Sequence, residues 1–176
     1  MVVRPSARLW ADPGLVVRPS AIEGSGLFGA SDLEAGRVLI RLGGRLVGTE
    51  ELAGMIAAAN ANPALPYVDS VSVSEDVHLV LPPGTVAHFG NHSCDPTLWH
   101  EGTYAISARR DIRLGEELTI DYGTNSAAPG YFLACRCGEA LCRGVVTSED
   151  WRIPELQARY EGHWVPALQE RIAGSR

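Results

Sequence analysis

The sequence contains no lysine. All 15 of its basic side chains are arginines, and 21 acidic side chains oppose them, which gives a formal net charge of −6. An acidic chain without a basic cluster is a poor candidate for direct nucleic-acid binding, which depends on many cationic contacts to phosphates. The charge instead favours a basic protein as partner. No run of 18 apolar residues occurs, so the sequence predicts no membrane span.

Long uninterrupted elements are also missing. The segment Met1–Trp10 lacks the extended apolar stretch of a secretory signal peptide, so we expect a protein that is not exported. Across the 176 residues, 19 glycines and 11 prolines divide the chain into short pieces. This punctuation is typical of many short strands joined by turns. The length suits one domain with a small appendage, and a hydrophobic content of 45% argues against disorder.

The short pieces indicate a mainly β body. Apolar and alternating segments predict six strands, at Leu15–Arg18, Val38–Leu42, Val68–Val73, Val77–Leu81, Thr103–Ala108 and Glu117–Asp121. One inserted helix is expected over Glu50–Asn60, with Thr49 as its N-cap. After Ser148 the pattern changes. Pro154 and Pro166 suit first helical positions and predict short helices over Glu155–Glu161 and Ala167–Ile172.

All four cysteines fall in two compact motifs. Cys135, Cys137 and Cys142 form a C-x-C-x4-C cluster, and Cys94 lies in the segment Asn91–Pro96. Disulfides would allow three pairings, but the expected reducing compartment disfavours them. Four thiolates would complete the tetrahedral shell of a structural Zn²⁺, with no position open for catalysis. We favour zinc over disulfides and over four unrelated buried cysteines.

Four stretches resemble a known family. They are Gly24–Ala30 (GSGLFGA), Phe89–Pro96 (FGNHSCDP), Gly115–Gly123 (GEELTIDYG) and Cys135–Gly144 (CRCGEALCRG). In this order they are similar to the motifs of SET-domain protein-lysine methyltransferases that carry a cysteine-rich post-SET segment. The resemblance runs from Val16 to Val146. It implies a SET domain at 16–124, a post-SET zinc-binding segment at 125–146 and a helical C-terminal tail at 147–176.

The resemblance implies a β-clip fold of short curved sheets with a C-terminal pseudoknot. It also implies transfer of a methyl group from S-adenosylmethionine to a lysine side chain of another protein, for which a basic tail is one form of substrate. A chain without lysine cannot methylate its own side chains. Two alternatives stay open: a catalytically silent SET module that binds a protein or peptide, and a methyltransferase acting on an amine other than a lysine side chain.

The resemblance also implies roles for single residues. Tyr122 would be catalytic, with its hydroxyl beside the transferring methyl. Zinc would be held by Cys94, Cys135, Cys137 and Cys142. The cofactor-binding set would be Gly24, Ser25, Gly26, Leu27, Tyr67, His88, Asn91, His92 and Tyr122. Within it, Asn91 would hold the amino-acid end and His92 the adenine side through hydrogen bonds.

Several of these positions have a plainer interpretation. Gly24 and Gly26 could form an ordinary turn, and Tyr67 could be a core residue. Tyr131 and Phe132 could close over a ligand or pack under the zinc segment. Ile120, where the family often has an aromatic residue, leaves room for more than one methylation. Abundant Ala, Gly, Arg and Val suggest GC-rich coding, and with it a bacterial, cytoplasmic protein.

Overall fold

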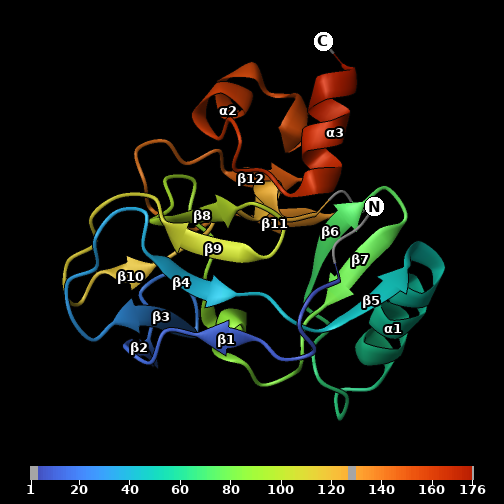
Figure 1. Cartoon of the computed structure of the whole chain (residues 1–176), viewed down its shortest axis with the longest axis horizontal. Coiled ribbons are helices and arrows are strands. Elements are labelled where there is room, and N and C mark those ends of the chain that lie inside the picture. Colours follow the sequence, from blue (N-terminus) through green and yellow to red (C-terminus); the bar gives the residue numbers. More distant parts are fainter. Residues whose placement is uncertain (1–3, 127–129, 176) are drawn as a thin grey trace.

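Four small antiparallel sheets build most of the molecule (Figure 1). The structure is a computed structural model and describes residues 4–126 and 130–175. The largest sheet has the order β1-β4-β9-β8, with strands Trp10–Ala11, Val38–Arg41, Ala105–Ala108 and Leu98–Glu101. A second has the order β10-β3-β2, with strands Glu117–Leu118, Ser25–Gly29 and Leu15–Pro19.

The two remaining sheets have three strands and two strands. The third has the order β5-β7-β6, with strands Arg45–Gly48, Val77–Val80 and Ser70–Ser74. The hairpin β11-β12 pairs Phe132–Ala134 with Val145–Thr147 and carries the cysteine-rich loop between its strands. This division confirms the expected mainly β class. Three residues of the loop between residues 125 and 130, namely 127–129, lie outside the described residues.

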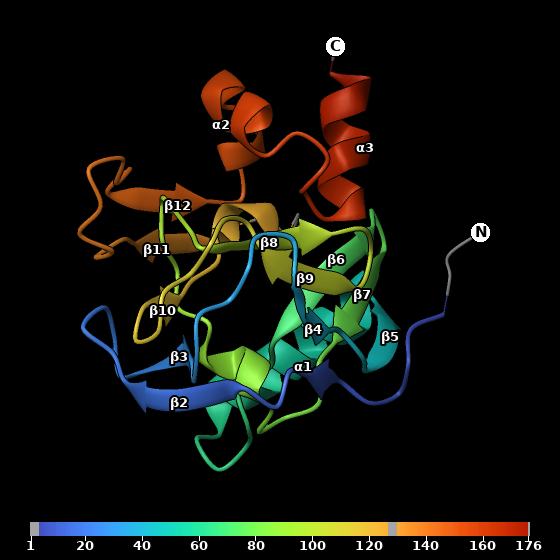
Figure 2. The ribbon, with the colours of Figure 1, turned by 60° about the vertical axis from the view of Figure 1, so that its left-hand side comes forward.

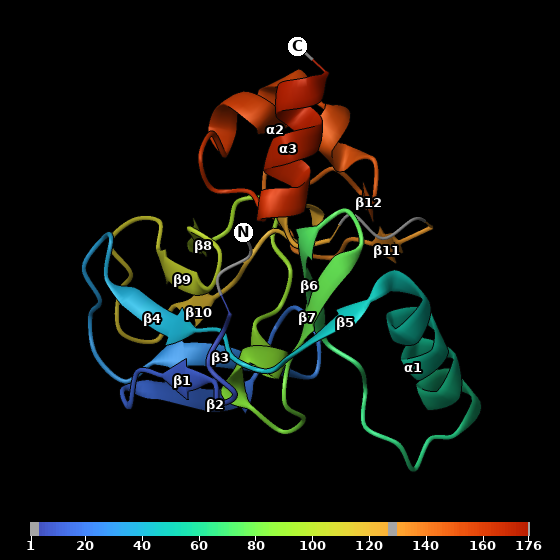
Figure 3. The same ribbon diagram turned by 45° about the vertical axis from the view of Figure 1, so that its right-hand side comes forward.

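Helices cover the outside of the sheets. The helix α1 (Thr49–Ala61) stands beside β5, whereas α2 (Pro154–Arg159) and α3 (Pro166–Gly174) lie together at the opposite end of the molecule (Figure 3). The 3₁₀ turns Val86–Phe89 and Tyr122–Thr124 connect sheets, whereas the 3₁₀ turn Asp150–Arg152 leads from β12 into α2 (Figure 2). In the part of the chain that the structure describes, no helix has both the length and the apolar character needed to cross a bilayer.

The predicted elements all occur, with two kinds of error. The inserted helix and both tail helices are confirmed, with Pro154 and Pro166 in their first turns. The expected N-cap is wrong: Gly48 is the N-cap of α1, and the Thr49 hydroxyl lies 3.0 Å from Nε2 of His78 instead. Several strands were missed, most importantly β3. Its glycine-rich sequence is typical of a turn, yet pairing with both β2 and β10 makes it the central strand of its sheet.

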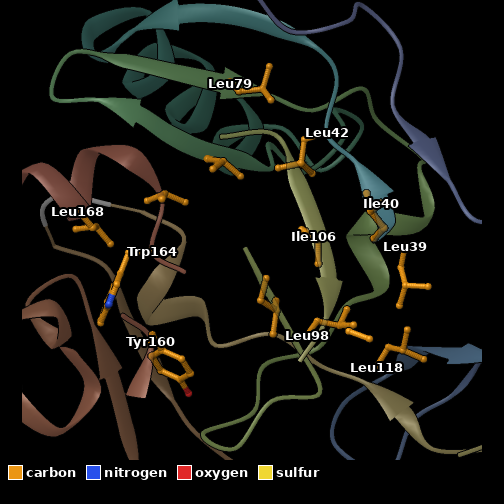
Figure 4. Close-up of a cluster of buried hydrophobic side chains, with 14 of the residues drawn as sticks. Leu39, Ile40, Leu42, Leu79, Leu98, Ile106, Leu118, Tyr160, Trp164 and Leu168 are labelled. Carbon is orange, nitrogen blue, oxygen red and sulfur yellow. The ribbon is translucent and has the colours of Figure 1, made fainter. Parts of the chain in front are cut away.

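One hydrophobic core joins the sheets to the C-terminal helices (Figure 4). Leu39, Leu98 and Leu118 of the sheets belong to it and are almost fully buried. From the other side, Tyr160, Trp164 and Leu168 of the C-terminal segment enter the same cluster, and none of the three is more than 2% exposed. The C-terminal segment is therefore an integral part of the core that supports the central sheet.

Candidate functional site

Tyr122 is positioned by two segments that run side by side. A parallel bridge joins His92 to Ile120, in which Ile120 N–H donates to the Asn91 carbonyl and Ser93 N–H donates to the Ile120 carbonyl. Tyr122 follows this bridge by two residues, and its hydroxyl reaches back to donate a 2.9 Å hydrogen bond to the Gly90 carbonyl oxygen. Burial, and then the charge of Asp69, raise the pKa of the Tyr122 hydroxyl, so it remains a protonated, oriented donor.

A small pocket of about 210 Å³ lies beside this residue. Tyr67, Tyr122 and Tyr131 contribute to its wall, together with apolar side chains such as Ile106 and Ile120. Tyr67 is 77% exposed and thus stands at the rim rather than in the core. The volume is too small for a large cofactor but matches an extended amino-acid side chain. Aromatic faces at such a site also favour a cation.

The pocket has a polar side as well. Asp69, His88 and His100 line it. The Nε2 atom of His100 lies 2.7 Å from Oδ1 of Asn125, and its buried Nδ1 has no hydrogen-bond partner within the described residues. Burial lowers the pKa of His100 to about 4, so this ring is neutral near pH 7. The site therefore combines one neutral histidine with one acid–histidine pair.

Asn91 organises the loop that precedes β3. Its side-chain amide lies within hydrogen-bond distance of the Ser20 hydroxyl, the Glu117 carboxylate and the carbonyl oxygens of Glu23 and Ser25, at 2.8 to 3.2 Å. The Glu117 carboxylate accepts hydrogen bonds from the Ser20 hydroxyl and the Asn91 amide, because it lies between these two segments.

Gly24 and Gly26 are each required as glycine, for different structural reasons. Gly24 has a φ of 52°, a left-handed conformation that side chains rarely adopt. A Cβ on Gly26 would lie only 2.2 Å from Oε1 of Glu117, so any side chain there would collide with the carboxylate. Ser25 between them is exposed, and the Leu27 side chain is buried in the core. The exposed Gly24 and Ser25, and not the buried Leu27 side chain, are therefore the parts of this stretch that can approach a ligand closely.

The His92 ring points into the protein. Its Nδ1 accepts a hydrogen bond from Tyr122 N–H at 3.2 Å, so the other nitrogen, Nε2, carries the proton and faces the Cys94 sulfur at 3.4 Å. Burial lowers the pKa of His92, which keeps the ring neutral. Both ring nitrogens are thus occupied. Because the bridge to Ile120 uses the neighbouring peptide groups, the N–H and C=O of His92 itself point to the opposite side.

The four cysteines come together as a set. Their sulfurs all lie within 4.8 Å of one another, and those of Cys94 and Cys135 are 3.7 Å apart. Four thiolates around Zn²⁺ at about 2.3 Å would be separated by roughly 3.8 Å, so this spacing fits zinc and not a disulfide. Backbone N–H groups of Cys137, Arg143 and Gly144 point at the sulfurs, as expected around negatively charged ligands.

A buried ionic network links this cluster to Tyr122. The guanidinium of Arg143 donates two 2.7 Å hydrogen bonds to the Asp121 carboxylate and one of 3.0 Å to Asp150. The Tyr160 hydroxyl donates to the same Asp121 carboxylate at 3.0 Å. Asp121 directly precedes Tyr122. The network therefore ties the cysteine-rich segment and the C-terminal segment to the 3₁₀ turn that carries the tyrosine.

Residues 24–123 match the family model of the SET domain. The chain belongs to the SET-domain family. The matched range lies within the expected SET domain at 16–124, and it includes Tyr122, Asn91, His92 and Cys94. The family resemblance stated for the sequence is thus confirmed.

Curated SET-domain relatives are named as histone-lysine methyltransferases. The histone-lysine N-methyltransferase SUV39H2 of Xenopus tropicalis is 38% identical over 85 residues, which is 35% of this chain and 21% of that protein. The histone-lysine N-methyltransferase ATX2 of Arabidopsis thaliana is 32% identical over 151 residues, 79% of this chain and 13% of that protein. The chain thus spans only a small part of the length of these relatives.

A solved SET domain confirms the fold. The methyltransferase domain of human histone-lysine N-methyltransferase SETMAR superposes with a TM-score of 0.61 at 21% identity, covering 75% of this chain and 57% of that one. Two titratable residues of the pocket, Asp69 and His100, were not identified from the sequence. Asp69 lies two positions after Tyr67, but both residues precede β6 and neither belongs to a strand, so no periodic pattern pointed to it.

Proposed function

We propose that this SET-domain protein transfers a methyl group from S-adenosylmethionine to a lysine side-chain amine of another protein. One observation carries the proposal: the Tyr122 hydroxyl is fixed by the Gly90 carbonyl in the wall of a small pocket lined by three tyrosines. Such a pocket suits the four-carbon stem and cationic end of lysine. Methylation needs a neutral amine in line with the methyl group, with water excluded, and the pocket supplies the alignment.

Residues on both sides of Tyr122 suit the bound cofactor. When bound, S-adenosylmethionine supplies an electrophilic methyl group on a sulfonium. We place the cofactor against the backbone of Gly24–Leu27 and the outward-facing peptide groups of His92. Asn91 would hold the loop that precedes β3 in position beside it. Tyr122 would orient the methyl end. Tyr67 and His88, which the resemblance assigns to the cofactor, line the acceptor pocket, so we place them where cofactor and amine meet.

Proton loss follows from the surroundings of the amine. The reference pKa of lysine is about 10.4, and desolvation in a pocket beside a positive sulfonium lowers it. A strong dedicated base is therefore unnecessary, and alignment with polar groups fixed around the moving charge would supply most of the rate.

We further propose a structural zinc ion bound by Cys94, Cys135, Cys137 and Cys142. The fit of the sulfur spacing supports it, and a shell of four protein ligands leaves no position for substrate. The ion would pin the cysteine-rich segment onto Cys94, two residues from His92. Zinc would thereby stabilise the site without taking part in methyl transfer.

The experiment is methyl transfer from labelled S-adenosylmethionine to an array of lysine-containing peptides and to cell extract, with mapping of the labelled atom. We expect Tyr122→Phe to lose turnover by roughly 10²- to 10³-fold while folding and zinc content persist. Tyr104→Phe is a matched control, because Tyr104 lies outside the pocket-lining set. Equal turnover of both variants would refute the role of Tyr122. No transfer and no cofactor binding by the wild type would favour the silent binding module.

A further inference from the structure

The acceptor pocket contains a carboxylate that the proposed reaction has not yet used. Asp69 directly precedes β6, and its side chain, 29% exposed, lines the pocket with Tyr67 and Tyr122. The negative charge of Asp69 contributes to the raised pKa of the Tyr67 and Tyr122 hydroxyls. The carboxylate is therefore close enough to interact electrostatically with both tyrosines. Its backbone is anchored, since the Asp69 carbonyl accepts a 3.0 Å hydrogen bond from Leu81 N–H.

His88 is the side chain that lies against this carboxylate. The Nε2 atom of His88 lies 3.0 Å from the Pro82 carbonyl oxygen, which can only accept, so Nε2 carries a proton. The other nitrogen, Nδ1, lies 3.4 Å from Oδ2 of Asp69. In the neutral ring that Nδ1 has a lone pair and cannot donate. His88 is therefore a full ionic partner only when doubly protonated.

Within the described part of the chain, Asp69 has no permanently charged cationic partner in the pocket. Among the residues that the structure describes, no arginine lines the pocket, and the chain contains no lysine. The titratable groups around the carboxylate are His88, the three pocket tyrosines and the neutral His100. Burial raises the pKa of Asp69 and outweighs the opposing effect of His88, which reflects this shortage of positive charge. A partly buried carboxylate of this kind is stabilised by a cation from outside.

We propose that Asp69 is a specificity-determining residue that recognises the ammonium form of the incoming side chain. An ammonium group offers three donors for the carboxylate, and the tyrosine faces add cation–π attraction. Neutral side chains of similar length, such as methionine or glutamine, would leave the carboxylate desolvated and without a cation. The identity of the cation as a lysine to be methylated rests on the proposed function.

Recognition of this kind affects binding more than the chemical step. A carboxylate stabilises the charged amine, so it does not assist loss of the proton, which leaves for solvent before methyl transfer. The contribution of Asp69 therefore belongs to docking of the substrate. Its loss should appear in KM, whereas loss of Tyr122 should appear in kcat.

The kinetic test uses the best acceptor peptide from the array. We expect Asp69→Asn to raise KM roughly tenfold, the size of one hydrogen bond to a charged group, with little change in kcat. Asp76→Asn is the matched control. It removes the same charge from the exposed turn between β6 and β7, at the opposite end of the hairpin, and should leave KM unchanged. An unchanged KM in a folded Asp69→Asn would overturn the inference.

A binding test removes the dependence on catalysis. Saturation-transfer NMR with n-butylammonium and, separately, n-butanol reports whether the pocket selects the charge at constant chain length. The wild type should show contact with n-butylammonium that Asp69→Asn loses and Asp69→Glu keeps, while n-butanol is unaffected. If the wild type shows no methyl transfer, the proposed function fails, but this test still decides the role of Asp69. Equal n-butylammonium signals in wild type and Asp69→Asn would refute it.

Discussion

Replacing Arg143 by glutamine should lower the free energy of unfolding by about 3 to 5 kcal/mol. The Arg143 side chain is 13% exposed and makes three charged hydrogen bonds, two to Asp121 and one to Asp150. Those carboxylates are only 1% and 6% exposed. Without the guanidinium, two buried negative charges would face each other. The donors left to Asp121, Tyr160 O–H and Gly123 N–H, are neutral and only partly offset this loss.

The magnitude is tested by urea denaturation against a matched arginine. Arg152 forms an ion pair with Glu149, but these side chains are 63% and 59% exposed. Arg152→Gln should therefore cost less than about 1 kcal/mol. The double variant Arg143→Gln/Asp121→Asn should recover part of the loss, because one stranded charge is removed. A cost for Arg143→Gln no larger than that for Arg152→Gln would show that the network does not hold the 3₁₀ turn of Tyr122 in place.

Three further predictions follow from the same site. Removing zinc with a strong chelator should lower Tm and expose the 135–142 segment to proteolysis, since structural zinc contributes folding energy; a metal-free protein with unchanged Tm would contradict the metal site. Burial lowers the pKa of His100 to about 4, whereas the same ring in the unfolded chain protonates near pH 6.5. The contribution of the neutral His100 to the free energy of unfolding should therefore be complete above pH 7 and should decrease as the pH falls from about 6.5 to about 4. The loss from His100 alone is roughly 2 kcal/mol at pH 5, and His100→Gln should flatten this dependence in urea titrations at several pH values. Ile120→Tyr would add a hydroxyl to the pocket wall and should shift mass-spectrometric products toward monomethyl-lysine; an unchanged product distribution would remove Ile120 as a determinant.

Local sequence patterns predicted much of the fold and the central residues of the site, namely Tyr122 and the cysteine group. Helix α1 was predictable because its apolar stripe has helical spacing, and the C-terminal helices because proline suits their first turns. The cysteines were predictable as one group because of their spacing and the order of the motifs. The tyrosine at the end of the E-E-L-T-I-D-Y stretch was singled out on the same motif grounds.

The tertiary structure decided the features that join distant segments. It turned the glycine-rich stretch at β3 into a central strand, directed the His92 ring toward Cys94, and placed Asp69 in the same pocket as Tyr122. It also buried Tyr160 against Asp121, which makes the C-terminal segment part of the site's support. The periodicity and capping of a segment depend on its nearest neighbours in sequence, and so the sequence alone determined them. Which carboxylate meets which cation depends on contacts across dozens of residues, and these exist only once the sheets have packed together.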